Sequence, residues 1–289
     1  MREFTISGVV PSALTPFTLT GKPDLDLFQK HVAALDRAGV NGVLVGAESA
    51  GATPKEVSRL CAAAAAVTDK PILAAIYGDS TVETVQLANA AASARVAALF
   101  VAQPHYLFQP DESGLNGMFE ALRRSSDLPL IFANTTTGAL DYAGLIGIAS
   151  TGLIDAIAVS DAHILADLLC APRRLPVMAA IEDLAFVALL LGAETVVTAM
   201  AAVFPDDFAA MYADIRARDF ASARKIHERL TRLWHSVNHP EELLARLKLA
   251  ATAQGCAVGI PRSPYDALTP LAESQVSGAL VAEGKLPAH

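Results

Sequence analysis

The sequence predicts a closed (β/α)8 barrel with a C-terminal helical extension. The chain repeats one order of elements: a short apolar run, a polar turn and an amphipathic helix. The apolar runs are mostly continuous rather than alternating, which is typical of parallel strands that crossover helices bury on both faces. Eight such units within ~200 residues are what a closed barrel requires.

The expected strands lie at residues 8–14, 42–45, 71–76, 97–101, 128–133, 156–159, 176–180 and 195–198. A doubly wound open sheet is the alternative, and it usually carries a glycine-rich phosphate-binding turn after its first strand. Here residues 15–18 read TPFT, without a G-x-G-x-x-G motif. The barrel is therefore the better prediction.

The expected helices begin at recognisable residues. Thr53 is expected at an N-cap with Pro54 at the first helical position, and Asp24, Ser80 and Asp111 precede further amphipathic segments. After the last strand we expect helices near 205–216, 220–236 and 240–253, and then a tail to residue 289. We therefore divide the chain into a barrel, residues 1–203, and a helical extension, residues 204–289, packed together as a single unit.

Composition limits the classes of partner. A net charge of −8 and a pI near 5.3 argue against nucleic acid or a membrane surface. The three cysteines, at irregular spacing, are typical of buried thiols in a reducing compartment. The first residues lack the apolar run of a signal peptide, and no apolar stretch reaches the ~18 residues of a membrane span. We expect a cytoplasmic protein with neither nucleic acid nor membrane as a partner.

Polar side chains occur at the expected C-terminal ends of the strands, where barrel active sites form. They are Glu48, Tyr77, Asp79, His105, Tyr106, Asn134, Ser160, Asp161, His163 and Glu182. No arginine is among them, so the site is poorly suited to a dianion. We expect a small ligand that is neutral or cationic, or a metal ion that supplies positive charge.

Most of these residues also have an ordinary structural explanation. Glu182 is compatible with a helix N-terminus, Asp161 with local capping, His105 with a loop and Tyr106 with a subunit interface. Ser160 is compatible with a small filler or with a ligand-binding hydroxyl. Glu48 is harder to explain in this way, because a charge buried without a partner after a strand is costly.

Several segments occur in an order and spacing that resemble one known family. They are residues 13–17 (ALTPF), 103–106 (QPHY), 128–134 (LPLIFAN), 191–193 (LGA), 196–198 (VVT), 219–224 (DFASAR) and 261–264 (PRSP). They resemble the dihydrodipicolinate synthase and N-acetylneuraminate lyase family over nearly the whole chain. The resemblance implies a lyase of class I aldolase type, which holds pyruvate or a pyruvate-yielding substrate as a Schiff base. It also implies a homotetramer built from dimers, and no cofactor is expected.

The chain departs from the family pattern at the catalytic positions. The resemblance places the Schiff-base lysine at Ser160 and the proton-relaying tyrosine at Ala133. The carboxylate-binding turn reads GAESA at 46–50, so two threonines are gone and an acid has entered. Ala180 stands where the family has a glycine, and the family's arginine after the fifth strand has no counterpart in residues 134–138. Tyr106 and Asn134 are kept, and the tyrosine matching Tyr106 reaches a neighbouring subunit's site in the family.

The candidate catalytic positions are therefore Tyr106 and Ser160. The candidate substrate-binding residues are Glu48, Ser49, His105, Asn134, Asp161 and Ala180. None of the seven lysines lies at the C-terminal end of an expected strand, so conventional imine chemistry is not expected.

Three functions remain open, each in a homo-oligomer, dimeric or tetrameric, that acts on or binds a small molecule. One is a lyase that no longer uses an imine, and another is a non-catalytic binding or regulatory descendant. The third is a metal-dependent aldolase or hydratase, which would need Glu48, Asp161 and His105 or His163 to converge on a divalent ion.

Overall fold

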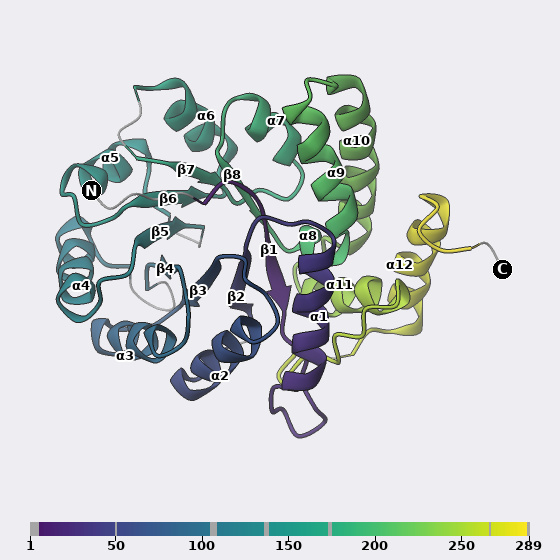
Figure 1. Ribbon diagram of the computed structural model, residues 1–289, viewed down its shortest axis with the longest axis horizontal. Helices are drawn as coiled ribbons and strands as arrows, with labels where there is room; N and C mark the ends of the chain where they lie inside the picture. The colour runs from purple at the N-terminus through teal and green to yellow at the C-terminus, as the bar shows by residue number, and fades with distance from the viewer. Residues whose placement is uncertain are drawn as a thin grey trace.

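A computed structural model describes residues 6–49, 51–104, 109–135, 139–172, 175–265 and 267–287. Parallel strands form a closed barrel in sequence order, and the last strand pairs with the first (Figure 1). They are β1 Gly8–Leu14, β2 Val43–Glu48, β3 Ile72–Ile76, β4 Ala98–Ala102, β5 Leu130–Asn134, β6 Ala156–Val159, β7 Val177–Ala179 and β8 Thr195–Thr198. The predicted fold class, a TIM barrel followed by C-terminal helices, is confirmed.

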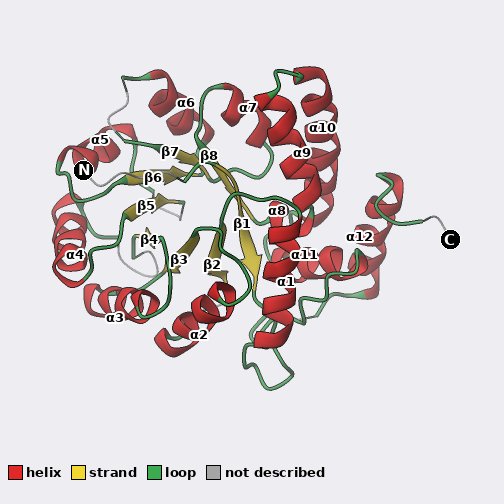
Figure 2. Ribbon diagram, viewed as in Figure 1, coloured by secondary structure: helices red, strands yellow, loops and turns green. Residues whose placement is uncertain are grey.

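Helices alternate with the strands and surround the barrel (Figure 2). They are α1 Leu25–Arg37, α2 Pro54–Ala65, α3 Thr81–Ala92, α4 Glu112–Ser125, α5 Tyr142–Ser150, α6 Ala162–Cys170 and α7 Ala185–Leu190. Helices α8 to α12 follow β8, and α9 to α12 gather on one side of the barrel (Figure 1). Their bounds are α8 Met200–Val203, α9 Pro205–Arg216, α10 Phe220–Val237, α11 Leu243–Ala253 and α12 Pro270–Ala282.

The caps expected from the sequence are present. The Thr53 side chain accepts a hydrogen bond from the Glu56 amide, and the Glu56 carboxylate accepts one from the Thr53 amide. Asp24, Ser80 and Asp111 likewise cap α1, α3 and α4. These side chains satisfy amide groups that the first helical turn leaves without a partner.

The expectation of a plain tail after residue 253 is wrong, because α12 forms within it. This helix begins with the same pair of residues as α2: Thr269 caps it, and Pro270 occupies the first turn. Its side chains Val276 and Leu280 are buried, so the helix contributes apolar surface to the extension.

Side chains of each strand alternate between the barrel interior and the surrounding helices. In β6, Ala156 and Ala158 belong to the interior cluster, whereas Ile157 and Val159 pack in the outer cluster beneath the helices. Both sets of side chains are buried, which explains the continuous apolar runs. In the described part of the chain, no helix is long and apolar enough to cross a membrane.

Strand β2 is longer than expected and ends at Glu48 rather than at Val45. Its last residues pair with the end of β1, where Leu14 lies opposite Glu48 across an irregularity in the register. This extension carries Glu48 to the C-terminal mouth of the barrel.

Candidate functional site

A small cavity opens at the C-terminal ends of the strands. Its volume is about 110 Å³, and strand ends on several sides of the barrel line it. The lining residues are Ser12, Leu44, Ala47, Glu48, Tyr77, Phe100, Thr135, Ala180, Glu182, Val197, Thr198 and Ala199. The two acids are the only charged side chains in this described lining. The cavity therefore has an acidic character and suits a ligand of only a few non-hydrogen atoms.

Glu48 is half-buried, and its carboxyl group has an unusual protonation equilibrium. Burial raises its pKa to about 7, and the charge of Glu182 acts in the same direction. A hydrogen bond from the Ser12 hydroxyl to Oε1, at 3.1 Å, and the charge of Lys248 partly oppose that rise. A carboxyl group with such a pKa exchanges protons near neutral pH.

Glu182 follows β7 and is held more firmly than Glu48. The amides of Ala199 and Met200 donate to its two carboxylate oxygens at 2.9 and 3.1 Å, and the Thr198 hydroxyl donates to Oε2. Burial raises the pKa of Glu182 above its ordinary value, and these three hydrogen bonds offset only part of that rise. The sequence suggested that Glu182 stabilises the N-terminus of the helix that follows it, α7. Glu182 instead accepts hydrogen bonds from the start of α8.

Tyr77, which follows β3, is the other ionisable group in the cavity lining. Its side chain is 42% exposed. Desolvation and the nearby Glu48 carboxylate both raise the pKa of its phenol. Tyr77 therefore stays protonated at neutral pH and can donate a hydrogen bond beside Glu48.

Among the other predicted site residues, Ala180 lines the cavity. Ser49 and Asn134 do not, and both form hydrogen bonds within the protein. Ser49 is buried next to Thr15, and their hydroxyl oxygens lie 2.8 Å apart. Asn134 is fully buried, and both ends of its amide bond the backbone of Leu140, at 2.8 and 2.9 Å. Asn134 thus fixes the loop after β5.

Ser160 and Asp161 lie at the end of β6. Both are exposed, and neither lines the cavity. Asp161 Oδ1 accepts hydrogen bonds from the His163 and Ile164 amides, each at 2.9 Å, and so caps α6. His105 and Tyr106 fall outside the described residues. Among the described residues, no group of three or more His, Cys, Asp or Glu side chains could hold a metal ion.

The sequence reasoning missed Lys248, which belongs to α11 but ends close to the barrel mouth. Its side chain is fully buried, and Nζ donates to the carbonyls of Thr15, Val258 and Ile260 at 2.5, 3.2 and 2.7 Å. Burial lowers its pKa to about 7, and the charge of Glu48 acts in the opposite direction. Residues 243–253 are apolar except for Arg246, Lys248 and Thr252, and a lysine inside this run was the available sequence signal.

Comparison with known proteins agrees with this fold. The family model of the "Dihydrodipicolinate synthetase family" matches residues 5–283. The 4-hydroxy-tetrahydrodipicolinate synthase of Methanosarcina barkeri is 26% identical over 277 residues, covering 92% of this chain and 94% of that protein. That of Methanothrix thermoacetophila is 28% identical over 239 residues, covering 78% and 80%.

Solved structures show the same fold. A prophage protein of E. coli K12 from the dihydrodipicolinic acid synthase family, in complex with pyruvate, superposes with a TM-score of 0.90. It is 21% identical, and the match covers 98% of this chain and all of that chain. The enzyme from Cyanidioschyzon merolae, with lysine bound, gives a TM-score of 0.87 at 24% identity, with 98% and 100% coverage.

Proposed function

Because this chain belongs to the dihydrodipicolinate synthetase family, we propose that it is a lyase of aldolase ancestry acting on a small polar metabolite. The proposed chemistry is acid–base catalysis by Glu48 without a Schiff base. The observation that carries the proposal is the Glu48 carboxyl group, whose pKa is about 7, in a cavity at the C-terminal ends of the strands. A group with this pKa serves both as an acid and as a base at neutral pH.

The neighbours of Glu48 suit the removal of a proton from carbon next to a carbonyl, or the elimination of water. Tyr77 is a neutral phenol in the same lining and can donate to a carbonyl oxygen that gains negative charge. Glu182 is bonded by two amides and a hydroxyl, so its carboxyl group is held in place and is less free than that of Glu48 to reach a ligand.

The ligand class follows from the charges at the mouth. No arginine or lysine is in the described lining, and the three carbonyls around Lys248 use all the donors of an ammonium group. We therefore propose a neutral or cationic ligand. The family resemblance further supports a homo-oligomer, dimeric or tetrameric, and a cytoplasmic location.

The absence of an imine is tested by borohydride trapping with pyruvate, followed by intact-mass measurement. We expect no adduct on the wild-type protein, because Ser160 cannot form an imine and Lys248 is committed to backbone carbonyls. An adduct on the wild type would overturn the proposal. The variant Ser160→Lys serves as a comparison, and an adduct on it alone would show that the barrel still admits pyruvate.

The ligand class is tested with pyruvate and its neutral isostere pyruvamide. We expect pyruvamide to bind more tightly near pH 8, because the ionised Glu48 carboxylate repels a carboxylate. The preference should shrink as Glu48 gains its proton below about pH 7. Tighter binding of pyruvate near pH 8, measured by calorimetry, would contradict the proposal.

A non-catalytic binding protein is the second candidate, and two residues favour it. Ala133 fills the barrel interior where the resemblance places a catalytic tyrosine, and the Asn134 amide is used by the backbone. The two candidates differ in proton exchange. A lyase that uses Glu48 should exchange the methyl protons of pyruvamide for solvent deuterium, which NMR detects. Glu48→Gln should abolish this exchange. The remote control Glu241→Gln should leave the exchange unchanged. Binding without exchange would support the second candidate.

A further inference from the structure

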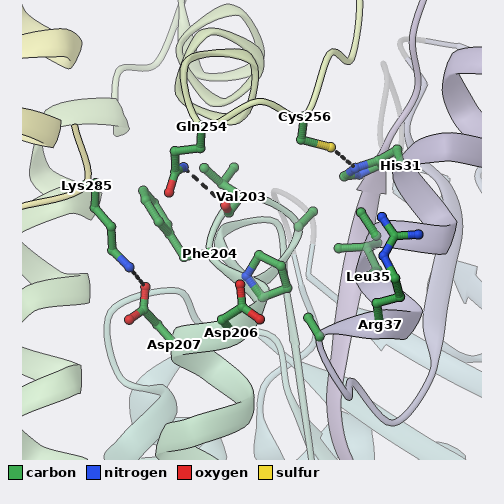
Figure 3. Close-up of a pocket in the computed structure, with 14 residues that line it drawn as sticks. His31, Leu35, Arg37, Val203, Phe204, Asp206, Asp207, Gln254, Cys256 and Lys285 are labelled. Carbon is green, nitrogen blue, oxygen red and sulfur yellow. Dashed lines mark hydrogen bonds and ion pairs between the residues drawn. The ribbon is translucent and has the colours of Figure 1, made fainter. Parts of the chain in front are cut away.

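The segment that follows α11 packs on the loop after β1, and we call residues 256–262 the C-terminal strap. At the start of the strap, Sγ of Cys256 lies 3.1 Å from Nδ1 of His31, which belongs to α1 (Figure 3). Near its end, Ile260 forms a β-bridge with Phe17. The strap thus joins the C-terminal extension to the chain that leaves the first strand.

The middle of the strap is held closely on both sides. A Cβ at Gly259 would lie 3.0 Å from the backbone N and O of Phe17, and its φ of 64° is in the left-handed region that favours glycine. From the other side, Nζ of Lys248 donates to the carbonyls of Val258 and Ile260. These contacts fix the strap beside the barrel mouth.

Arg262, the last residue of the strap, reaches the loop that follows β2. Its Nη2 donates to the carbonyls of Ser49 and Gly51 at 3.1 and 2.9 Å. Its Nη1 pairs with Oε1 of Glu56 at 2.8 Å, and the guanidinium carbon lies 4.5 Å from the centre of the Phe17 ring. The Arg262 side chain is only 16% exposed. A planar guanidinium can bind several acceptors in fixed directions, which an ammonium group cannot do.

These contacts lie next to Glu48 in the chain. Strand β2 ends at Glu48, so the residues that follow are positioned by contacts from outside the sheet. Ser49 comes directly after it, and Arg262 holds the Ser49 carbonyl. On the other side of the same residue, the Glu48 carboxyl group accepts the hydrogen bond from Ser12 and lines the mouth cavity.

We propose that Arg262 is a positioning residue for Glu48. By binding the Ser49 and Gly51 carbonyls from the strap, Arg262 keeps the end of β2 where the Glu48 carboxyl group lies beside Ser12 and inside the mouth cavity. Its part in catalysis rests on the proposed function of Glu48, whereas the positioning itself does not.

The pKa of Glu48 reports its position. Among the described residues, the ionisable groups that face its carboxyl group are Glu182, Tyr77 and Lys248. The substitution Arg262→Lys leaves these groups and the positive charge of the strap in place, but it removes the guanidinium fork. Burial is the largest cause of the raised pKa and exceeds the opposing effect of the Ser12 bond. Release of the loop admits water, so it should lower the pKa toward its ordinary value.

The test is a pH titration of the full-length protein, labelled with 13C at the glutamate carboxyl groups and followed by NMR. The resonance missing in Glu48→Gln identifies Glu48. We expect a pKa of about 7 in the wild type and a value about one unit lower in Arg262→Lys. Glu56→Gln keeps the guanidinium and its carbonyl bonds, so it should leave the pKa of Glu48 unchanged. An unchanged or raised pKa in Arg262→Lys would overturn the proposal.

Arg123→Lys is the matched control for a loss of stability. Arg123 donates to two carbonyls and pairs with Asp155, ahead of β6 and therefore at the opposite end of the barrel from Glu48. This variant should lose stability without moving the pKa of Glu48, and an equal shift would overturn the proposal. If Arg262→Lys does not fold, Phe17→Leu removes the ring beside the guanidinium without removing a charge, and the same direction of shift is expected.

Deuterium exchange into pyruvamide separates positioning from catalysis. If Glu48 catalyses the exchange, Arg262→Lys should lower its rate at least about tenfold and should move the pH profile by the same amount as the NMR pKa. Arg123→Lys should leave both unchanged. A wild type that exchanges no deuterium would remove the proposed function of Glu48, and the NMR titration would still decide the role of Arg262.

Discussion

The hydroxyl of Ser12 donates a hydrogen bond to Oε1 of Glu48 across the first two strands of the barrel, at 3.1 Å. This single bond is the only direct hydrogen bond that the described residues provide to the Glu48 carboxyl group. Glu182, in contrast, receives bonds from Thr198, Ala199 and Met200. The two acids of one cavity therefore differ in how well their charged forms are stabilised.

Replacing Glu48 by glutamine should stabilise the protein above neutral pH. The folded-state pKa of about 7 lies above the ordinary value of 4.5, so wild-type stability falls as pH rises from about 4.5 through about 7. The full difference corresponds to roughly 3 kcal/mol. In urea unfolding, we compare the free energy of unfolding of Glu48→Gln with that of the wild type. The variant minus wild-type difference should be about 1–3 kcal/mol larger near pH 8 than near pH 5.

Comparing the wild type with Glu48→Gln separates the effect of Glu48 on stability from that of His31, which changes stability with pH in the opposite direction. His31 has a lowered pKa of about 4, so it makes the wild type more stable as pH rises toward 6.5. That contribution is present in both proteins and cancels in the difference. The exposed Glu241→Gln should leave the pH profile unchanged, and an equal gain at both pH values for Glu48→Gln would contradict the prediction.

Replacing Lys248 by methionine should destabilise the protein by roughly 2–4 kcal/mol, because three carbonyls lose their donor while the side-chain volume is retained. Nζ also lies 5.1 Å from the centre of the Phe17 ring, a contact that the variant loses. Chemical denaturation measures the loss. The exposed Lys225→Met is the control, and a loss below about 1 kcal/mol in Lys248→Met would show that water replaces the lysine.

Replacing Asp161 separates capping from ligand binding. Asp161→Ala should cost about 1 kcal/mol of stability, and Asp161→Ser should restore most of it, because serine also caps helices. Neither variant should change pyruvamide affinity, measured by calorimetry. A loss of affinity in Asp161→Ser at unchanged stability would instead assign Asp161 to the ligand, as the sequence also allowed.

The parts of the fold that could be predicted are those determined by nearby residues. Thr53 and Pro54 lie next to the helix that they start, and the apolar run of β6 reflects burial on both faces of one strand. Ala180 and Glu48 were placed at the mouth for the same reason, since each follows a recognisable strand. The helix α12 was also within reach, because Thr269 and Pro270 repeat the pattern of α2.

Other features of the site depend on contacts between distant parts of the chain. The residues that hold Glu182 lie 16 to 18 positions later and belong to the next strand and helix. The use of Asn134 by Leu140 depends on how one loop closes, which residue types alone do not determine. The hydrogen bond between His31 and Cys256 joins residues 225 positions apart, and no local pattern marks that pairing.

The bond between Lys248 and Thr15 has a consequence for the order in which the protein is completed on the ribosome. Thr15 emerges early, but the ammonium group that binds its carbonyl comes 233 residues later. The rim beside β1 therefore cannot reach its final form while the barrel strands alone have been synthesised. A nascent chain that stops after β8 lacks this donor, so the Thr15 carbonyl can be paired in this way only after α11 has been synthesised.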